Sequence, residues 1–118
     1  MKRIAVVGSR TFNDYDVLKK ALDEHPPFIL VSGGAEGADS LAERYADEQD
    51  YEKIILKPDW KKYGKAAGLK RNQEIINLAD EVVSFWNKMS EGTGHSLELA
   101  RKKQIPITII SFLSEDKK

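Results

Sequence analysis

The sequence predicts one Rossmann-like α/β domain, in which helices cover both faces of a parallel sheet. Two observations predict this fold class. Five short apolar runs recur along the chain, and most are continuous rather than alternating, as in strands buried on both faces. Segments whose apolar residues recur at helical spacing lie between these runs, so strand and helix alternate.

The expected strands are the five apolar runs, at residues 4–7, 28–31, 54–56, 82–86 and 105–110. Right-handed crossovers between parallel strands place helices on both faces, which gives three layers and an expected strand order of 3-2-1-4-5.

Four helices are expected between the strands. The first has Val17, Leu18, Ala21 and Leu22 on one face, and the second has Ala38, Leu41, Ala42, Tyr45 and Ala46. Leu69, Ile76 and Ala79 indicate a third helix, and Leu97 with Ala100 a fourth. Two prolines, Pro26 and Pro27, end the first helix before the second strand, and residues 58–68 are expected to form a long loop.

The length of 118 residues is that of one domain. We expect the domain to cover residues 1–113, because no internal repeat or linker interrupts it, and residues 114–118 to form a charged tail.

Composition excludes several classes of protein. The chain has no cysteine and two histidines, so we expect no disulfide, no metal site and no metal cofactor. No apolar stretch is long enough for a signal peptide or a membrane span, which favours a cytoplasmic protein without a membrane partner. Lysine plus arginine equals aspartate plus glutamate, 19 each, and this absence of an overall positive field argues against a nucleic-acid partner.

Glycines and small hydroxyl residues follow the expected strands, where open α/β sheets bind ligands. They occupy residues 8–11, 32–39 and 90–96, at the points where helices begin. Backbone N–H groups at such turns, with hydroxyls of Ser9, Ser32, Thr93 and Ser96 and a guanidinium from Arg10, suit a phosphate group. The alternative is that each glycine only makes a tight strand-to-helix turn. Neither the dinucleotide G-x-G-x-x-G motif nor a P-loop is present, so no nucleotide cofactor of those types is expected.

Several short motifs resemble those of the SLOG superfamily in identity and order. They are Gly8-Ser9-Arg10, residues 32–39, Arg71-Asn72, Ala79-Asp80 and Gly92-Thr93-Gly94. The chain is most similar to the small YspA/YpsA-related members, whose signatures appear here as Pro58-Asp59-Trp60 and Tyr63-Gly64-Lys65. The resemblance covers about residues 3–110 and implies a Rossmann-like sheet with a nucleotide-related ligand. We therefore expect the chain to bind or sense a phosphorylated nucleotide derivative, such as an ADP-ribose-like molecule or a nucleoside monophosphate.

Two alternatives also come from this resemblance. LOG-type phosphoribohydrolases of the superfamily cleave nucleoside monophosphates, and their catalytic arginine and glutamate would correspond to Arg71 and Glu98. Glu98 lies five residues past Thr93 rather than the three of the LOG motif, which puts the hydrolase alternative in doubt. A DprA-like nucleic-acid accessory protein is the second alternative, because Gly8-Ser9-Arg10 and Arg71-Asn72 are shared with DprA-type proteins.

The expected ligand-binding residues form one set around the sheet edge. They are Gly8, Ser9, Arg10, Ser32, Gly33, Gly34, Gly37, Asp39, Trp60, Lys65, Asn72, Gly92, Thr93 and Gly94. Trp60 can stack on a base or pin its loop to the core, and Lys65 can meet a phosphate or lie in water. We also expect a homodimer or larger homo-oligomer, because Phe12, Trp86 and Phe112 are left over as apolar surface.

Overall fold

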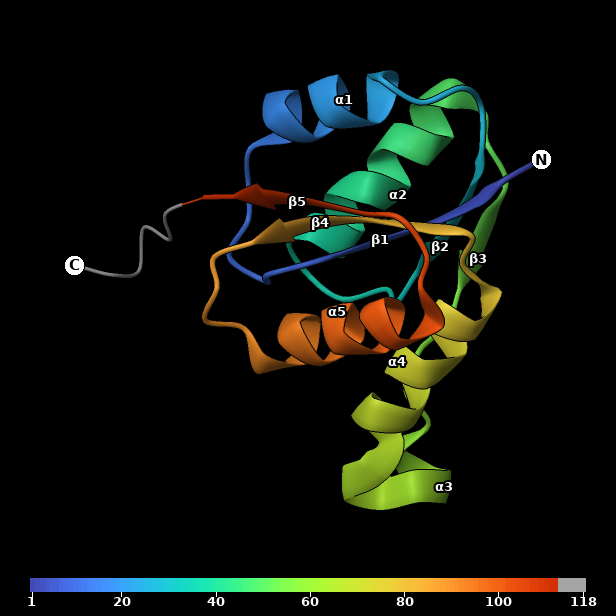
Figure 1. The fold of residues 1–118 in the computed structure, drawn as a ribbon, viewed down its shortest axis with the longest axis vertical. Coiled ribbons are helices and arrows are strands. Elements are labelled where there is room, and N and C mark those ends of the chain that lie inside the picture. The colour runs from blue at the N-terminus through green and yellow to red at the C-terminus, as the bar shows by residue number, and fades with distance from the viewer. Residues whose placement is uncertain (113–118) are drawn as a thin grey trace.

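A five-stranded parallel sheet forms the centre of the protein, which is described by a computed structural model for residues 1–112 (Figure 1). The strands are β1 (Arg3–Gly8), β2 (Ile29–Ser32), β3 (Lys53–Ile55), β4 (Glu81–Trp86) and β5 (Ile107–Ser111). Their order is β3-β2-β1-β4-β5, and every neighbouring pair is parallel. The predicted fold class and strand order are confirmed.

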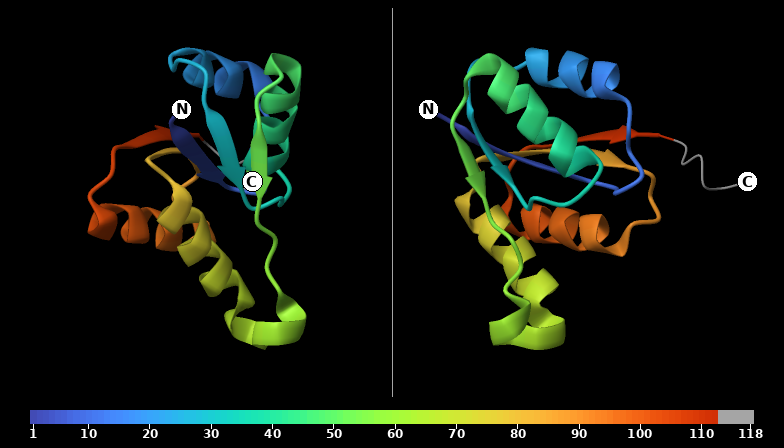
Figure 2. Two further views of the ribbon diagram at one scale, coloured as in Figure 1. Left: turned by 90° about the vertical axis from the view of Figure 1, so that its right-hand side faces the viewer. Right: turned by 180° about the vertical axis from the view of Figure 1, so that it is seen from behind.

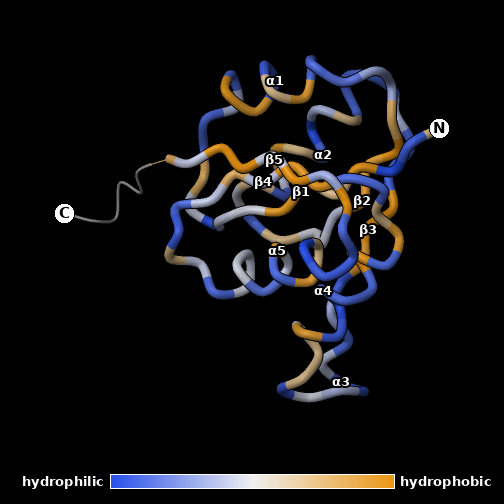
Figure 3. Tube along the Cα trace, in the orientation of Figure 1, coloured by the Kyte–Doolittle hydropathy of each residue, from blue (hydrophilic) through white to orange (hydrophobic). Residues whose placement is uncertain are grey.

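Two pairs of helices cover the two faces of the sheet (Figures 1 and 2). The helices α1 (Tyr15–Asp23) and α2 (Ala38–Gln49) lie on one face, and α4 (Ala67–Leu78) and α5 (Glu91–Lys103) on the other. Each face has its own buried core. Leu18, Leu22 and Ala42 pack against the first face, whereas Ile75, Ile76 and Leu97 pack against the second. Apolar segments accordingly concentrate in the strands (Figure 3).

The chain changes direction across the sheet between β1 and β4. The first three strands proceed outward on one side of β1, and β4 then pairs with the other side of β1. The connections that leave the carboxyl ends of β1 and β4 therefore diverge to opposite faces. A crevice at this reversal point is where doubly wound sheets bind ligands.

Residues 58–68 differ from the predicted long loop, because most of them are helical. The short helix α3 (Trp60–Tyr63) and the 3₁₀ turn η1 (Gly64–Ala66) lead directly into α4. Asp59 starts α3, since its carboxylate accepts a hydrogen bond from the Lys62 N–H at 3.1 Å. Figure 2 shows that this segment projects from the body of the domain. We call residues 57–71 the arm.

The aromatic residues that suggested an oligomer interface pack within the chain. Phe12 is buried and stacks on Phe85 with ring centroids 4.9 Å apart, and Phe112 meets the edge of Phe12 at 5.0 Å. The indole N–H of Trp86 donates to the Ser90 carbonyl at 3.0 Å. These contacts remove the reason for expecting self-association, which stays an untested prediction.

Two further expectations concern the chain ends and membranes. The proposed charged tail, residues 114–118, lies outside the described residues, so its boundary with the domain stays a prediction. Among residues 1–112, no helix combines the length and apolar character needed to cross a bilayer.

Candidate functional site: a basic hollow at the carboxyl edge of the sheet

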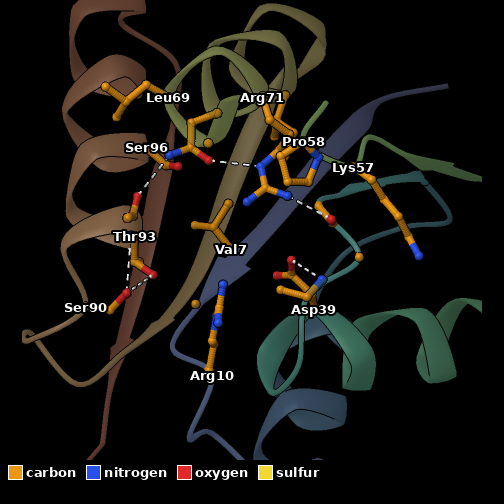
Figure 4. A pocket seen from close by; sticks show the side chains of 18 of the residues that line it. Val7, Arg10, Asp39, Lys57, Pro58, Leu69, Arg71, Ser90, Thr93 and Ser96 are labelled. Atoms are coloured by element: carbon orange, nitrogen blue, oxygen red, sulfur yellow. Dashed lines mark hydrogen bonds between the residues drawn. The ribbon is translucent and has the colours of Figure 1, made fainter. Parts of the chain in front are cut away.

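A hollow of about 530 Å³ opens at the carboxyl ends of the central strands, in the crevice expected from the topology. We call it the main hollow; Figure 4 shows it from close by. Predicted site residues that line it are Gly8, Arg10, Gly33, Gly34, Asp39, Trp60, Lys65, Arg71, Asn72, Gly92 and Thr93. The remaining lining residues are Val7, Ala35, Lys57, Pro58, Gly68, Leu69, Ile75, Ser90 and Ser96.

Arg71 lies across the main hollow from α4. Its Nη1 donates to the Gly33 carbonyl at 2.8 Å and to the Leu56 carbonyl at 3.4 Å, and its Nε donates to the Asn72 side-chain oxygen at 3.1 Å. A side chain at position 33 would overlap the guanidinium, so the glycine there permits this close approach. Its Nη2 makes no hydrogen bond within residues 1–112 and can donate to a ligand.

Arg10 brings a second guanidinium into the same space. Its side chain extends into the main hollow from the turn after β1 (Figure 4). Partial burial lowers the pKa of Arg71, the charge of Asp39 opposes that change, and the positive charge of Arg10 lowers it further. The positive charges of Arg10 and Arg71 repel each other, so an anion bound between them would be stabilised.

Asp39 is the single carboxylate that lines the main hollow within the described chain. It is 7% exposed and stands in the first turn of α2, where it accepts a hydrogen bond from the Ala35 N–H at 3.1 Å. Burial raises its pKa, while the bonds from the Ala35 and Gly33 backbone and the charge of Arg71 oppose that rise. Asp39 therefore fastens the loop of residues 33–35 and already uses backbone donors that were expected to hold a ligand.

The start of α5 forms the opposite wall. Ser90 caps this helix by accepting from the Thr93 N–H at 3.4 Å, and the two hydroxyls lie 3.1 Å apart. Asn72 joins α4 to this wall, because its Nδ2 donates to the Gly92 carbonyl at 3.4 Å and lies 3.2 Å from His95 Nδ1. Asn72 thus positions Arg71 rather than only contacting a ligand.

The arm supplies the rim of the main hollow. Trp60 is 59% exposed and Leu69 is 55% exposed, so two large apolar side chains face solvent beside the hollow. Lys57 and Lys65 add two exposed cations. An apolar rim next to cations suits a ligand that carries both a flat ring and a phosphate.

Four predicted ligand-binding residues do not line the hollow, because they lie within the scaffold behind it. Ser9 exchanges hydrogen bonds with Asn87, donating to its Oδ1 at 3.0 Å and accepting from its N–H at 3.1 Å. Gly37 has a φ of 76°, and a side chain there would overlap the carbonyls of Ser9 and Arg10. Ser32 is fully buried in β2, and Gly94 packs against the ring of Trp86.

The residues of the expected catalytic pair are not brought together. Arg71 lines the main hollow, but Glu98 does not; its side chain is 61% exposed and pairs with Arg101 at 3.4 Å. Glu98 follows Ser96, which does line the hollow, by two positions, and this turns it about 200° around the helix. Glu98 and Arg71 therefore do not face one common ligand position in this geometry.

Lys57 and Ser90 also line the main hollow but were missed from the sequence, whereas Ser96 was expected only as a possible hydroxyl donor. Lys57 follows β3 by two residues, so its position just past the strand end was a usable signal. Ser90 precedes α5 as its N-cap, and Ser96 follows Gly92 by one turn on the same face of that helix.

Comparisons with known proteins agree with this architecture. The sequence model of the YspA, cpYpsA-related SLOG family matches residues 2–63. The Gene 61 protein of Mycobacterium phage D29 is 36% identical over 118 residues, covering 91% of this chain and 94% of that protein. DNA processing protein A (DprA) from Streptococcus pneumoniae superposes with a TM-score of 0.79 at 21% identity, over 98% of this chain and 52% of that one. DprA from Helicobacter pylori, whose single-stranded DNA binding mode has been described structurally, superposes with a TM-score of 0.64 at 22% identity, over 97% and 67%.

These likenesses correct one expectation. Zero net charge was taken as an argument against a nucleic-acid partner, yet a protein with this fold, from Helicobacter pylori, binds single-stranded DNA. The argument was wrong because net charge does not report how charges are distributed. Four cations and one carboxylate line the main hollow of a chain that is neutral as a whole. The present chain spans about half the length of the Streptococcus pneumoniae protein.

Proposed function

The chain belongs to the YspA, cpYpsA-related SLOG family. We propose that its main hollow binds single-stranded nucleic acid through a phosphate group. Bases next to that phosphate would lie on the rim formed by Trp60 and Leu69. In this arrangement the cations bind the phosphates of the nucleic acid, and the exposed apolar side chains contact its bases.

One observation carries the proposal, namely the pair of guanidiniums that share one hollow and form no salt bridge within the described chain. Arg10 and Arg71 enter the same hollow, and neither forms a salt bridge with a carboxylate of residues 1–112. Guanidinium groups hold phosphates through paired N–H donors, and partial exclusion of water strengthens such contacts. A phosphodiester placed between the two side chains would relieve their mutual repulsion.

The fold likeness adds support of a weaker kind. DprA from Helicobacter pylori binds single-stranded DNA, and its fold matches nearly all of this chain. At 22% identity this likeness concerns the fold, so the ligand is proposed from the cations and the rim of this chain itself.

A free nucleotide is the second candidate, and the size of the hollow favours it. A volume of about 530 Å³ lies within the usual range of small-molecule pockets, and the floor between β1 and α5 is lined by small residues. In that case the same two arginines would hold the terminal phosphate, and the exposed rim would carry the base.

Fluorescence anisotropy with a labelled oligothymidylate tests the main proposal. We expect salt-sensitive binding, with the association constant falling by about 0.7 log units per tenfold salt for each phosphate held. Arg10→Ala should weaken binding roughly 10- to 100-fold through loss of a charge-assisted contact. Binding that is independent of salt concentration and unchanged in Arg10→Ala would refute the proposal. If AMP or ADP-ribose bound as tightly as the oligonucleotide, the second candidate would be favoured.

A further inference from the structure

We propose that the nucleic-acid strand continues out of the main hollow into a second hollow on the arm, where Lys62, Lys70 and Tyr63 bind its next nucleotides. This inference rests on the proposed function and extends it. It assigns a second subsite, and with it a ligand longer than one nucleotide.

The second hollow is adjacent to the first and shares two cations with it. It measures about 240 Å³ and lies against α3 and the first half of α4. Lys57 and Arg71 line both hollows, and Figure 4 shows them on either side of Pro58. A strand that passes from one hollow to the other would therefore stay next to cations that line both.

Each hollow combines cations with one aromatic side chain from α3. Trp60 lines the main hollow, whereas Tyr63, one turn along the same short helix, lines the second. The ammonium groups of Lys62 and Lys70 each lie 5.2 Å from the centre of the Tyr63 ring. The second hollow thus repeats the chemistry of the first, with a ring for a base and cations for a phosphate.

The balance of charge follows the same path. Six cations line the two hollows together: Arg10, Lys57, Lys62, Lys65, Lys70 and Arg71. They face three carboxylates, of which Asp39 and Asp59 already accept backbone hydrogen bonds, while Glu74 stands at the far end on α4. The two hollows thus have more cations than carboxylates. Because the whole chain has zero net charge, the remaining residues together carry a net negative charge.

A single nucleotide bound in the main hollow would not reach this second set of groups. A strand of several nucleotides can also occupy the space between Lys62, Lys70 and Glu74. Affinity should therefore rise with strand length up to the point at which both hollows are filled, and the added part should depend on Lys62 and Lys70.

The experiment compares thymidylate dinucleotide and octanucleotide binding to the whole protein by calorimetry and anisotropy. The variant is Lys62→Ala with Lys70→Ala, and the matched control is Lys20→Ala with Lys102→Ala, which removes the same charge from α1 and the end of α5. We expect the first variant to reduce the ratio of octanucleotide to dinucleotide affinity roughly fivefold, through loss of two exposed ion pairs. The salt slope for the octanucleotide should fall by about 1.4, the value for two phosphates of a single strand. Tyr63→Leu should also lower the ratio.

The outcomes separate this inference from the proposed function. An affinity that does not grow between the two lengths, or a ratio equal in the Lys62/Lys70 variant and the control, would overturn the second subsite. If Arg10→Ala still weakened both ligands, the proposed function would stand alone. If Arg10→Ala had no effect on either ligand, the proposed function itself would fail.

Discussion

The glycine-rich turns and the arm both border the main hollow, but their polar groups are used differently. In the turns most groups are already bonded within the chain, as Ser9 is to Asn87 and Asp39 to the Ala35 N–H. On the arm, Lys57, Lys65 and Trp60 are exposed. The turns therefore fix the shape of the hollow, whereas the arm and Arg10 carry the groups that are free for a ligand.

This difference has a physical origin in burial. Backbone groups at the centre of a fold cannot be left without partners, since an unpaired buried group costs free energy, and the nearest partners are the side chains of adjoining loops. The arm projects from the domain (Figure 2), so water can satisfy its charged groups until a ligand displaces it. Apart from Arg10 and Arg71, substitutions in the turns should therefore alter stability, and substitutions on the arm should alter binding.

The largest expected effect is on stability, from Gly37→Ala. A methyl group there would overlap the carbonyls of Ser9 and Arg10 and would also hold an alanine at a φ of 76°. We expect the free energy of unfolding to fall by about 3 kcal/mol, from steric overlap and backbone strain together. Gly64→Ala is the matched control, because Gly64 also has positive φ, 55°, but no atom lies within 4 Å of the added carbon. Urea denaturation of both variants measures this, and equal losses would refute the crowding argument.

The second effect separates the two arginines. Arg71→Ala removes hydrogen bonds to the carbonyls of Gly33 and Leu56, so it should lower the unfolding free energy by about 1–2 kcal/mol as well as weaken binding. Arg10→Ala should weaken binding to a similar extent and leave stability unchanged, since its side chain is exposed and makes no hydrogen bond or salt bridge within residues 1–112. Denaturation and anisotropy on the same samples test this. Arg71→Ala with full stability would show that its carbonyl contacts do not matter for the fold.

The third effect concerns the rim. Trp60→Ala should lower oligonucleotide affinity roughly tenfold, because stacking of a base on an aromatic ring contributes about 1–3 kcal/mol. Trp60→Phe should retain most of the affinity, since a ring remains. In the unaltered protein, ligand binding should quench the fluorescence of Trp60. The other tryptophan, Trp86, is half-buried and donates to the Ser90 carbonyl, so Trp86→Phe should preserve that quenching. Quenching that survives in Trp60→Phe would place the base elsewhere.

Much of the fold was predictable because the signals for it are local. The apolar runs at residues 4–7 and 82–86 are too continuous for exposed strands, and both became central strands. The helix at Trp60–Tyr63 was missed although Asp59, a common N-cap residue, stands directly before it. A helix of four residues has no periodicity to detect, so the segment from Pro58 to Gly68 was expected to be a loop.

The position of the main hollow was predictable from the sequence, but only part of its lining was. Sequence indicates that Gly37 begins a helix, but not that its backbone lies against Ser9, because that contact joins distant segments. Helical spacing did separate Glu98 from Ser96, and this signal was available in the sequence. Net charge concealed the basic track, since the compensating carboxylates lie elsewhere on the surface.

The smallest expected effect, from Asp39→Asn, falls where turn and ligand site meet. Burial raises the pKa of Asp39, so the folded protein holds this proton more tightly than the unfolded chain. The stability that this proton contributes is present at low pH and is lost as pH rises from the ordinary carboxyl range through the raised pKa. Asparagine can still accept from the Ala35 N–H and has no proton to lose, so the variant should gain stability relative to the unaltered protein as pH rises through that window.

The same substitution should strengthen binding of the anionic ligand at neutral pH. It removes the carboxylate whose charge opposes the lowered pKa of Arg71, and we expect affinity to rise roughly two- to fivefold. Asp16→Asn, on the exposed face of α1, makes the same change in net charge away from the hollow and should have no such effect. Urea denaturation between pH 3.5 and 7, with anisotropy at neutral pH, measures both parts. Weaker binding by Asp39→Asn would mean that the carboxylate contacts the ligand directly, for instance through a sugar hydroxyl, rather than serving only to fasten the loop.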